Sequence, residues 1–223
     1  MMLTATRQPL SHLLRDATAA AHGYAEKSPF MSRLVAGSLT RAAVADYTAQ
    51  LWFIYRALEE GVRANGDGPF LSAVADQRLE RVYALEADLV ELIGPEWREE
   101  IVPGPGTAAF VELLTGLSDT GDDLALLAHH YVRYLGDLSG GQVIARMLRD
   151  RYGVTDAGVN FYRFNDIGKI KPYRDGYRSA LDGLELTDEQ SAHLVAAAQE
   201  AFAANGRVFQ DLADRHCSVS DCF

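Results

Sequence analysis

The sequence predicts an all-α, single-domain bundle of helices, and three observations support this prediction. Apolar residues recur at helical spacing along most of the chain, and no convincing run of strand-like alternation interrupts them. The 223 residues are enough for one domain with a core, and 48% hydrophobic with 23% charged residues is an ordinary globular composition. No internal repeat divides the chain. We therefore expect one domain over residues 1–215 and a flexible tail over 216–223.

The elements of the first half are predicted from apolar periodicity and from the residues that begin or end helices. Proline suits the start of a helix, whereas glycine and proline together end one. In order, we expect a helix after Pro9, a helix capped by Ser38 or Thr40 that runs toward Gly61, a loop over 65–69, and a helix over 71–92 that ends at Gly94-Pro95.

The second half is predicted in the same way and brings the total to about seven helices. The run Thr-Asp-Glu-Gln at Thr187 resembles a capping box, in which side chains and backbone N–H groups pair at a helix start. We expect a turn over 103–106, a short helix over 110–117, a long helix from about Asp122 to Tyr152, a loop-rich basic stretch over 153–171, and a last long helix from about Thr187 to Leu212.

Charge and cysteine content limit the classes of partner. The chain has 31 acidic and 21 basic residues and a formal charge of -10, so we expect no nucleic-acid partner, and an anionic ligand only where cations cluster. The N-terminal stretch has no apolar run long enough for a signal peptide, and no run elsewhere is long enough for a membrane span, so we expect neither. The two cysteines, Cys217 and Cys222, lie in the tail. These features predict a reduced, cytoplasmic protein of unknown oligomeric state.

Three glycines interrupt the long helix and call for an explanation. Each of Gly136, Gly140 and Gly141 costs about 1 kcal/mol relative to alanine inside a helix. By helical spacing, Gly136 and Gly140 share one face with Arg133 and Asp137. That face offers bare backbone beside one cation and one carboxylate. It suits a large flat ligand, and close packing of another helix against small residues is the alternative.

A histidine near the N-terminus is the strongest candidate for a metal ligand. His22 precedes Glu26 by four residues, so the two side chains can meet on one helix face. A neutral ligating histidine commonly donates its second ring N–H to a carboxylate. Arg15 lies two turns away on the same stripe. The alternative is a histidine that only packs or faces solvent.

A local excess of cations follows the long helix. Five basic residues are opposed by two aspartates between positions 163 and 178; they are Arg163, Lys169, Lys171, Arg174 and Arg178. Arginine suits a rim that binds carboxylates, because its guanidinium can form two parallel hydrogen bonds. A solvated loop and helix face is the alternative.

At this point four motifs, in order, resemble the heme oxygenase family over about Leu10 to Leu212. The most specific is YVRYLGDLSGGQ at 131–142, which is similar to the family's distal helix. The others are LRDATAAAH at 14–22 followed by Glu26 and Phe30-Met31, YRSALDGLELTDEQ at 177–190, and AFAANGRVF at 201–209. The run NDIGKIKPYRDGYR at 165–178 looks closest to the bacterial, actinobacterial-type branch.

The resemblance implies a heme held between a proximal helix and a kinked, glycine-rich distal helix. His22 would be the axial iron ligand and Glu26 the partner of its free N–H. Gly136 and Gly140 would let the distal helix approach the porphyrin, and Asp137, helped by Arg133, would anchor a water network. Further contacts are implied for the propionate-facing Arg15, Tyr131, Lys169 and Arg178, for Ser139, and for the pocket walls Phe202, Asn205 and Phe209.

The implied activity is cleavage of heme b, which is both substrate and cofactor, with O2 and electrons. The products would be biliverdin, CO and ferrous iron, with the ring opened at the α-meso carbon. An external donor, a reductase or a ferredoxin, would supply electrons, because no flavin or nicotinamide fingerprint is present. The chain departs from many relatives at Arg15, where lysine is common, and at Ala19, where some mammalian members carry a second basic group.

Other activities on a similar scaffold stay open. A non-catalytic heme carrier would not need the oxygen-orienting Asp137 and glycines. A thiaminase-like hydrolase needs a cysteine nucleophile, and both cysteines lie in the tail. A di-iron oxidase needs several inward histidines and carboxylates on different helices, whereas His22 and Glu26 are the only pair well placed for such a role.

Overall fold

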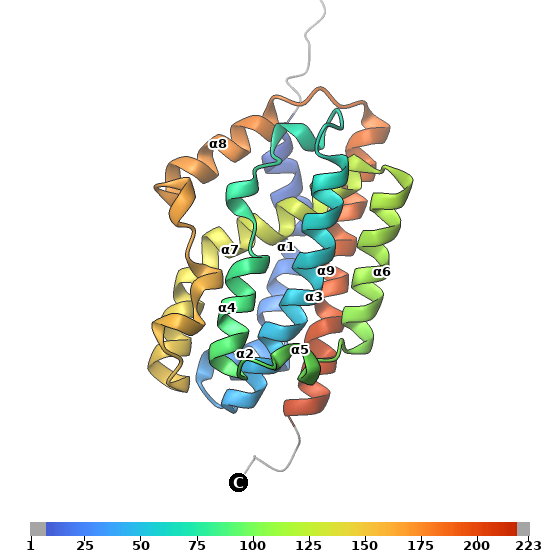
Figure 1. Cartoon of the computed structure of the whole chain (residues 1–223). Helices are drawn as coiled ribbons and strands as arrows, with labels where there is room; N and C mark the ends of the chain where they lie inside the picture. Colours follow the sequence, from blue (N-terminus) through green and yellow to red (C-terminus); the bar gives the residue numbers. More distant parts are fainter. Residues whose placement is uncertain (1–7, 218–223) are drawn as a thin grey trace, which may run out of the picture.

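The computed structural model describes residues 8–217, and in this part of the chain it consists of α-helices joined by short 3-10 turns, with no β-strand. Figure 1 shows the helices, most of them running along the length of the molecule. They are α1 (Leu10–Glu26), α2 (Pro29–Ala36), α3 (Arg41–Asn65), α4 (Val82–Leu92), α5 (Trp97–Glu100), α6 (Pro105–Thr120), α7 (Asp123–Tyr152), α8 (Ile170–Asp182) and α9 (Asp188–His216). The prediction of an all-α fold is confirmed.

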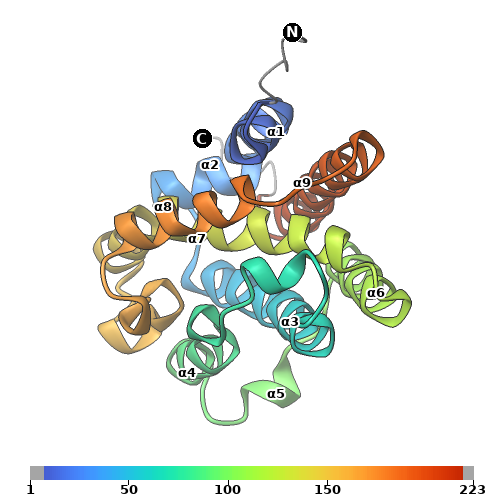
Figure 2. The ribbon, with the colours of Figure 1, turned by 90° about the horizontal axis from the view of Figure 1, so that it is seen from above.

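Two long helices, α7 and α9, organise the bundle. Seen from above, α7 crosses the middle of the molecule, with α3 on one side and α1 and α8 on the other (Figure 2). α9 packs against α7, α1, α6 and α2, and α3 packs against α4 and α6. α1 and α7 both pack on α9 but make little direct contact with each other. The arrangement thus places α1 and α7, which carry the predicted site, against the same supporting helix.

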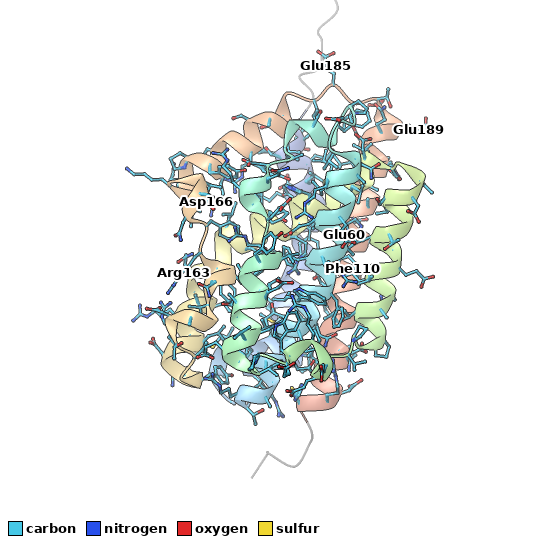
Figure 3. The ribbon with its side chains drawn as sticks, in the orientation of Figure 1. Glu60, Phe110, Arg163, Asp166, Glu185 and Glu189 are labelled. Carbon is cyan, nitrogen blue, oxygen red and sulfur yellow. The ribbon has the colours of Figure 1, made fainter. Side chains whose placement is uncertain are left out.

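The core is built from the apolar stripes that the periodicity predicts. Leu14 of α1, Phe30 of α2, Leu58 of α3 and Phe110 of α6 are fully buried. Figure 3 shows Phe110 inside the bundle, whereas charged side chains such as Arg163 lie toward its outside. Only one stripe of α1 is buried, so much of the surface of this helix remains free to contact a ligand. Burial of such large side chains is the main favourable contribution to folding.

Helix ends follow the expected chemistry at several places. The hydroxyls of Thr40 and Thr187 accept hydrogen bonds from backbone N–H groups in the first turns of α3 and α9. The capping box predicted at Thr187 is confirmed, because Gln190 also accepts a bond from the Thr187 backbone N–H. α7 ends at Gly153, whose positive φ of 62° is a conformation that favours glycine.

The predicted single helix over 71–92 is wrong, and buried carboxylates supply the reason. The chain forms two 3-10 turns, Leu71–Ala73 and Gln77–Leu79, before α4 begins at Val82. Asp123 of α7 accepts hydrogen bonds from the backbone N–H groups of Phe70 and Leu71. Glu59 of α3 does the same for Arg81 and Val82. Each carboxylate accepts hydrogen bonds from backbone N–H groups at the start of a turn or helix, so a new turn or helix begins at each of these two points.

Other boundaries also differ from prediction. α2 forms a separate short helix, α6 begins at Pro105 inside the expected turn, and α8 begins at Ile170 inside the expected loop. α9 continues to His216, whose Nε2 lies 2.7 Å from Asp46 Oδ2, so the expected tail starts within a helix. Residues 218–223, including Cys222, lie outside the described part of the chain. Within residues 8–217, no helix is long and apolar enough to cross a membrane.

Candidate active site

His22 lies on the exposed side of α1, beside the predicted carboxylate partner. Its Nδ1 is 3.5 Å from Glu26 Oε2, and the His22 side chain is 53% exposed. Phe202 of α9 contacts the imidazole edge-on, with ring centroids 5.9 Å apart. Because Nδ1 faces the carboxylate, Nε2 is the nitrogen available to bind a metal ion. The structure thus brings together three of the predicted residues, His22, Glu26 and Phe202.

The two histidines of α7, unlike His22 of α1, are buried. His129 and His130 are both 1% exposed, and burial lowers their pKa values to about 4 and about 3. His130 Nδ1 lies 2.8 Å from the hydroxyl of Tyr177. Both are therefore neutral, enclosed side chains of the core, unlike the half-exposed His22.

The glycines of α7 divide into two kinds. A Cβ atom added at Gly136 or Gly140 would meet no side chain or neighbouring backbone within 4 Å. A Cβ atom added at Gly141 would lie 3.1 Å from Tyr162 Cδ1. Close packing therefore explains Gly141, as the alternative interpretation proposed. Gly136 and Gly140 face open space, which is the arrangement that the flat-ligand interpretation requires.

A polar network lies on the inner side of this glycine face. The Tyr55 hydroxyl of α3 donates a short hydrogen bond to Asp137 Oδ2. Arg133 donates to the Tyr55 oxygen at 3.3 Å and, through its terminal nitrogen, to Asn205 Oδ1 at 2.6 Å. The guanidinium also lies over the Tyr55 ring. Asn205, predicted as a wall residue, thus acts here as the partner that orients Arg133.

The network sets the charge state of Asp137. Burial raises the pKa of its carboxyl to about 6, and Arg133 and the Tyr55 hydroxyl oppose the shift. The residue as a whole is nevertheless only partly buried, so it lies at a boundary with accessible space. A carboxyl with a pKa near neutrality can exchange a proton with water at that boundary. Tyr55 was not a predicted site residue, because nothing in its local sequence places it beside Asp137.

Cations gather near Tyr131, one turn before the glycine face. Burial raises the pKa of the Tyr131 hydroxyl, and the charges of Arg178 and Arg15 oppose that shift, so both guanidinium groups lie near it. Arg15 forms an ion pair with Asp16 at 2.9 Å, and Arg178 lies 3.4 Å from Asp175. Three predicted residues from α1, α7 and α8 therefore form one cationic edge.

Arg174, rather than Lys169, completes this edge. Arg174 donates a hydrogen bond to Ser139 Oγ at 3.2 Å, and its Nε is buried without a hydrogen-bond partner. Lys169 is an exposed residue preceding α8, and its side chain forms no hydrogen bond or ion pair within residues 8–217. The signal for Arg174 is its spacing from Arg178, because residues four apart share a helix face. This spacing is informative only once α8 is known to be a helix.

These features fit an iron porphyrin better than the other groups considered. The uncommitted His22 nitrogen can bind the metal, the open space over Gly136 and Gly140 can take a flat ring, and the unpartnered Arg174 Nε can meet a carboxylate. Within residues 8–217 no three His, Cys, Asp or Glu side chains cluster as a metal site, which a di-iron centre would need. The chain therefore has the features of the helical proteins that bind heme.

Comparison with known proteins assigns the family. The family profile described as heme oxygenase matches residues 8–211 of this chain. A heme oxygenase from Porphyra purpurea is 35% identical over 91% of this chain and 86% of its own length. Heme oxygenase 1 from Synechocystis is 33% identical over 91% of this chain and 84% of its own length.

Solved structures agree. The crystal structure of heme oxygenase-1 from the cyanobacterium Synechocystis in complex with heme matches with a TM-score of 0.89 at 32% identity, covering 93% of this chain and 94% of that one. Heme oxygenase from Leptospira interrogans matches with a TM-score of 0.85 at 30% identity, covering 91% and 98% of the two chains. The chain belongs to the heme oxygenase family.

Proposed function

We propose that this protein binds heme b and cleaves it to biliverdin, CO and ferrous iron, opening the ring at the α-meso carbon. One observation carries the proposal: α1 presents His22 with its carboxylate partner, and α7 presents two glycines in open space beside Asp137. When bound, the heme supplies both the iron at which O2 is activated and the ring that is cleaved. An external reductase or ferredoxin provides the electrons.

His22 binds the iron through Nε2 in this proposal. Glu26 accepts the Nδ1–H hydrogen bond, which holds the imidazole in one tautomer and orientation. A neutral histidine donates less electron density to the iron than a thiolate does. The partial exposure of both side chains in the ligand-free chain supports the role, because a bound heme would cover this side of α1.

Asp137 holds a proton close to the ring, and the reaction consumes this proton. The Tyr55 hydroxyl and the Arg133 guanidinium keep its carboxyl in place, and its pKa of about 6 leaves it able to accept and release a proton near neutral pH. Gly136 and Gly140 leave the space beside this carboxyl unfilled. The absence of side chains there lets a flat ring lie close to the proton source.

The cationic edge binds the propionates and thereby selects which part of the ring lies near Asp137. Tyr131, Arg15 and Arg178 contribute charge and a hydroxyl, and Arg174 contributes an unused donor beside Ser139. Arginine forms strong, geometrically defined bonds with carboxylates. The cationic side chains of this edge come from α1 and α8, so it can orient the ring relative to α7.

The proposal is tested by loading the purified protein with heme without O2, then adding O2 and a reductant. Biliverdin of the α isomer should form, with CO and ferrous iron released, and product isomers are separated by chromatography. A protein that binds heme but returns it unchanged under these conditions is a carrier, which would contradict the proposed activity.

The axial role is tested separately by replacing His22 with alanine. His22→Ala should abolish turnover and the absorption spectrum of a histidine-ligated heme, because it removes the nitrogen proposed to bind the iron. His193→Ala is the matched control, since that histidine of α9 is also half-exposed but pairs with Asp122 at the start of α7. An unchanged spectrum and rate in His22→Ala would show that another group binds the iron.

A further inference from the structure

Two buried tyrosines beside Asp137 have no role in the function proposed above. Tyr47 of α3 is 6% exposed, and Tyr162 of the 3-10 turn Asn160–Tyr162 is 5% exposed. Within residues 8–217 neither hydroxyl has a hydrogen-bond partner. Neither oxygen is among the fully enclosed unpartnered atoms, which are Thr107 Oγ1, His129 Nδ1 and Arg174 Nε. Each hydroxyl therefore borders accessible space, although the ring that carries it is buried.

The Tyr47 ring is held in place by an aromatic row. Its centroid lies 5.6 Å from that of Phe30 and 6.2 Å from that of Phe209. Phe209 follows Asn205 by four residues and so shares a face of α9 with it. Because Asn205 binds Arg133, the Tyr47 ring packs against a residue, Phe209, that lies one helical turn from the Arg133–Asn205 hydrogen bond.

Tyr162 is attached to α7 just beyond Asp137. Its ring lies over Gly141, where an added Cβ atom would be only 3.1 Å away, and its backbone carbonyl accepts a 2.7 Å hydrogen bond from Gln142. Position 141 follows position 137 by four residues, so Gly141 and Asp137 lie on the same side of α7. The third glycine thus allows the Tyr162 ring to pack directly on α7, one turn beyond Asp137.

Electrostatic effects agree with this placement. Burial raises the pKa values of Tyr47 and Tyr162, and the negative charge of Asp137 contributes to both increases. Arg133 opposes the shift at Tyr47, and Tyr47 itself contributes at Tyr162. The two hydroxyls therefore remain protonated at neutral pH, so each has a hydrogen to donate.

We propose that Tyr47 and Tyr162 are positioning residues whose hydroxyls, together with that of Tyr55, donate hydrogen bonds to water or a small anion in the space beside Asp137. This inference rests on the proposed function, because it assumes that heme binds along α7. Three phenols from α3 and the α7–α8 connection would then order the molecules through which Asp137 exchanges its proton. Phenol O–H groups suit this task because they bind acceptors without adding charge.

The test uses fluoride, a small anion that binds to ferric heme and accepts hydrogen bonds from nearby donors. Tyr47→Phe and Tyr162→Phe keep the aromatic rings and remove only the hydroxyls. Each should lower the affinity of the heme-loaded protein for fluoride about threefold to tenfold, the effect of losing one hydrogen bond. Heme affinity should stay unchanged, because neither residue belongs to the axial or cationic contacts. Tyr83→Phe, at a 77% exposed tyrosine of α4, is the control.

Three outcomes contradict the inference in different ways. Fluoride affinity unchanged in both variants would show that the hydroxyls do not reach the ligand. A loss of heme affinity or of thermal stability, without a selective loss of fluoride affinity, would assign the tyrosines a structural role only. If the unaltered protein fails to bind heme or to form biliverdin, the proposed function itself is wrong, and this result is separate from any effect of the tyrosine variants.

Discussion

At the scale of single residues, the contrast between Arg174 and Lys169 shows what local sequence does and does not determine. Both are cations of the same basic stretch, and only the structure separates them: Arg174 Nε is enclosed and unpartnered beside Ser139, whereas the Lys169 ammonium is exposed. His22 and Glu26, in contrast, were predictable as a pair, because a spacing of four residues within one helix fixes their proximity.

This contrast gives a paired prediction. Arg174→Gln should weaken heme binding about tenfold, since a propionate carboxylate loses a charged donor that is already desolvated. Lys169→Gln removes the same formal charge from the same segment and should change heme affinity little. Heme affinity is measured by absorbance titration of both variants. Equal losses in the two variants would mean that only the general charge of the segment attracts the propionates.

A second residue-scale prediction concerns Asp137. Asp137→Asn keeps the size of the side chain and an oxygen that accepts the Tyr55 hydrogen bond, but removes the proton-exchanging group. Heme affinity should be retained while the yield of biliverdin per heme falls by about tenfold or more, the scale of a lost general acid–base contribution. Yield is measured under single-turnover conditions with excess reductant. A normal yield would remove Asp137 from the proton pathway.

At the scale of the element, the glycines of α7 lower the stability of the helix and leave part of its surface open to a ligand. Gly136→Ala and Gly140→Ala should each stabilise the ligand-free protein by up to about 1 kcal/mol, because alanine is the better helix former and the new methyl group meets nothing. Both should weaken heme binding. Gly141→Ala should instead destabilise the ligand-free protein, because its methyl group would press on Tyr162. Chemical unfolding of the three variants distinguishes these cases, and destabilisation by all three would show that the glycines serve packing alone.

The same scale shows why some elements were predictable and others were not. Over α7 and α9 the apolar pattern and the terminal residues, Gly153 and the Thr187 capping box, agree with each other. Over 71–92 the pattern is equally helical, but Asp123 and Glu59 bind the backbone from distant helices and divide it. α8 has no predicted bounds, because the predicted loop ends at 171 and the basic residues that follow show little apolar periodicity. Interactions with remote side chains are not encoded in local periodicity.

At the scale of the whole molecule, Glu59 joins three parts of the bundle at one buried point. From α3 it accepts hydrogen bonds from the backbone N–H groups of Arg81 and Val82 at the start of α4. It also accepts one at 3.2 Å from the Tyr134 hydroxyl of α7. The side chain is 2% exposed. Its partners are known only once the helices are assembled, so its role could not be predicted from the sequence.

Glu59 therefore makes global stability depend on pH in a defined direction. Burial raises the pKa of its carboxyl from 4.5 to about 7, so the folded state favours the protonated form. The destabilising contribution is absent below the unfolded pKa, develops as pH rises from about 4.5 through about 7, and is complete above the folded pKa. It amounts to about 3 kcal/mol at most, at about 1.4 kcal/mol for each pKa unit.

Glu59→Gln should remove that dependence, because an amide keeps an oxygen acceptor for the N–H groups but does not ionise. The stability of the variant relative to the unaltered protein should be higher at about pH 8 than at about pH 5, since only the upper pH requires a buried charge. The difference is measured by urea unfolding of the ligand-free protein at both pH values. Glu60→Gln is the matched control, at the next residue of α3 and 66% exposed (Figure 3). If Glu59→Gln follows Glu60→Gln at both pH values, Glu59 ionises in the folded protein without cost, and its hydrogen bonds to α4 and α7 fully offset its burial.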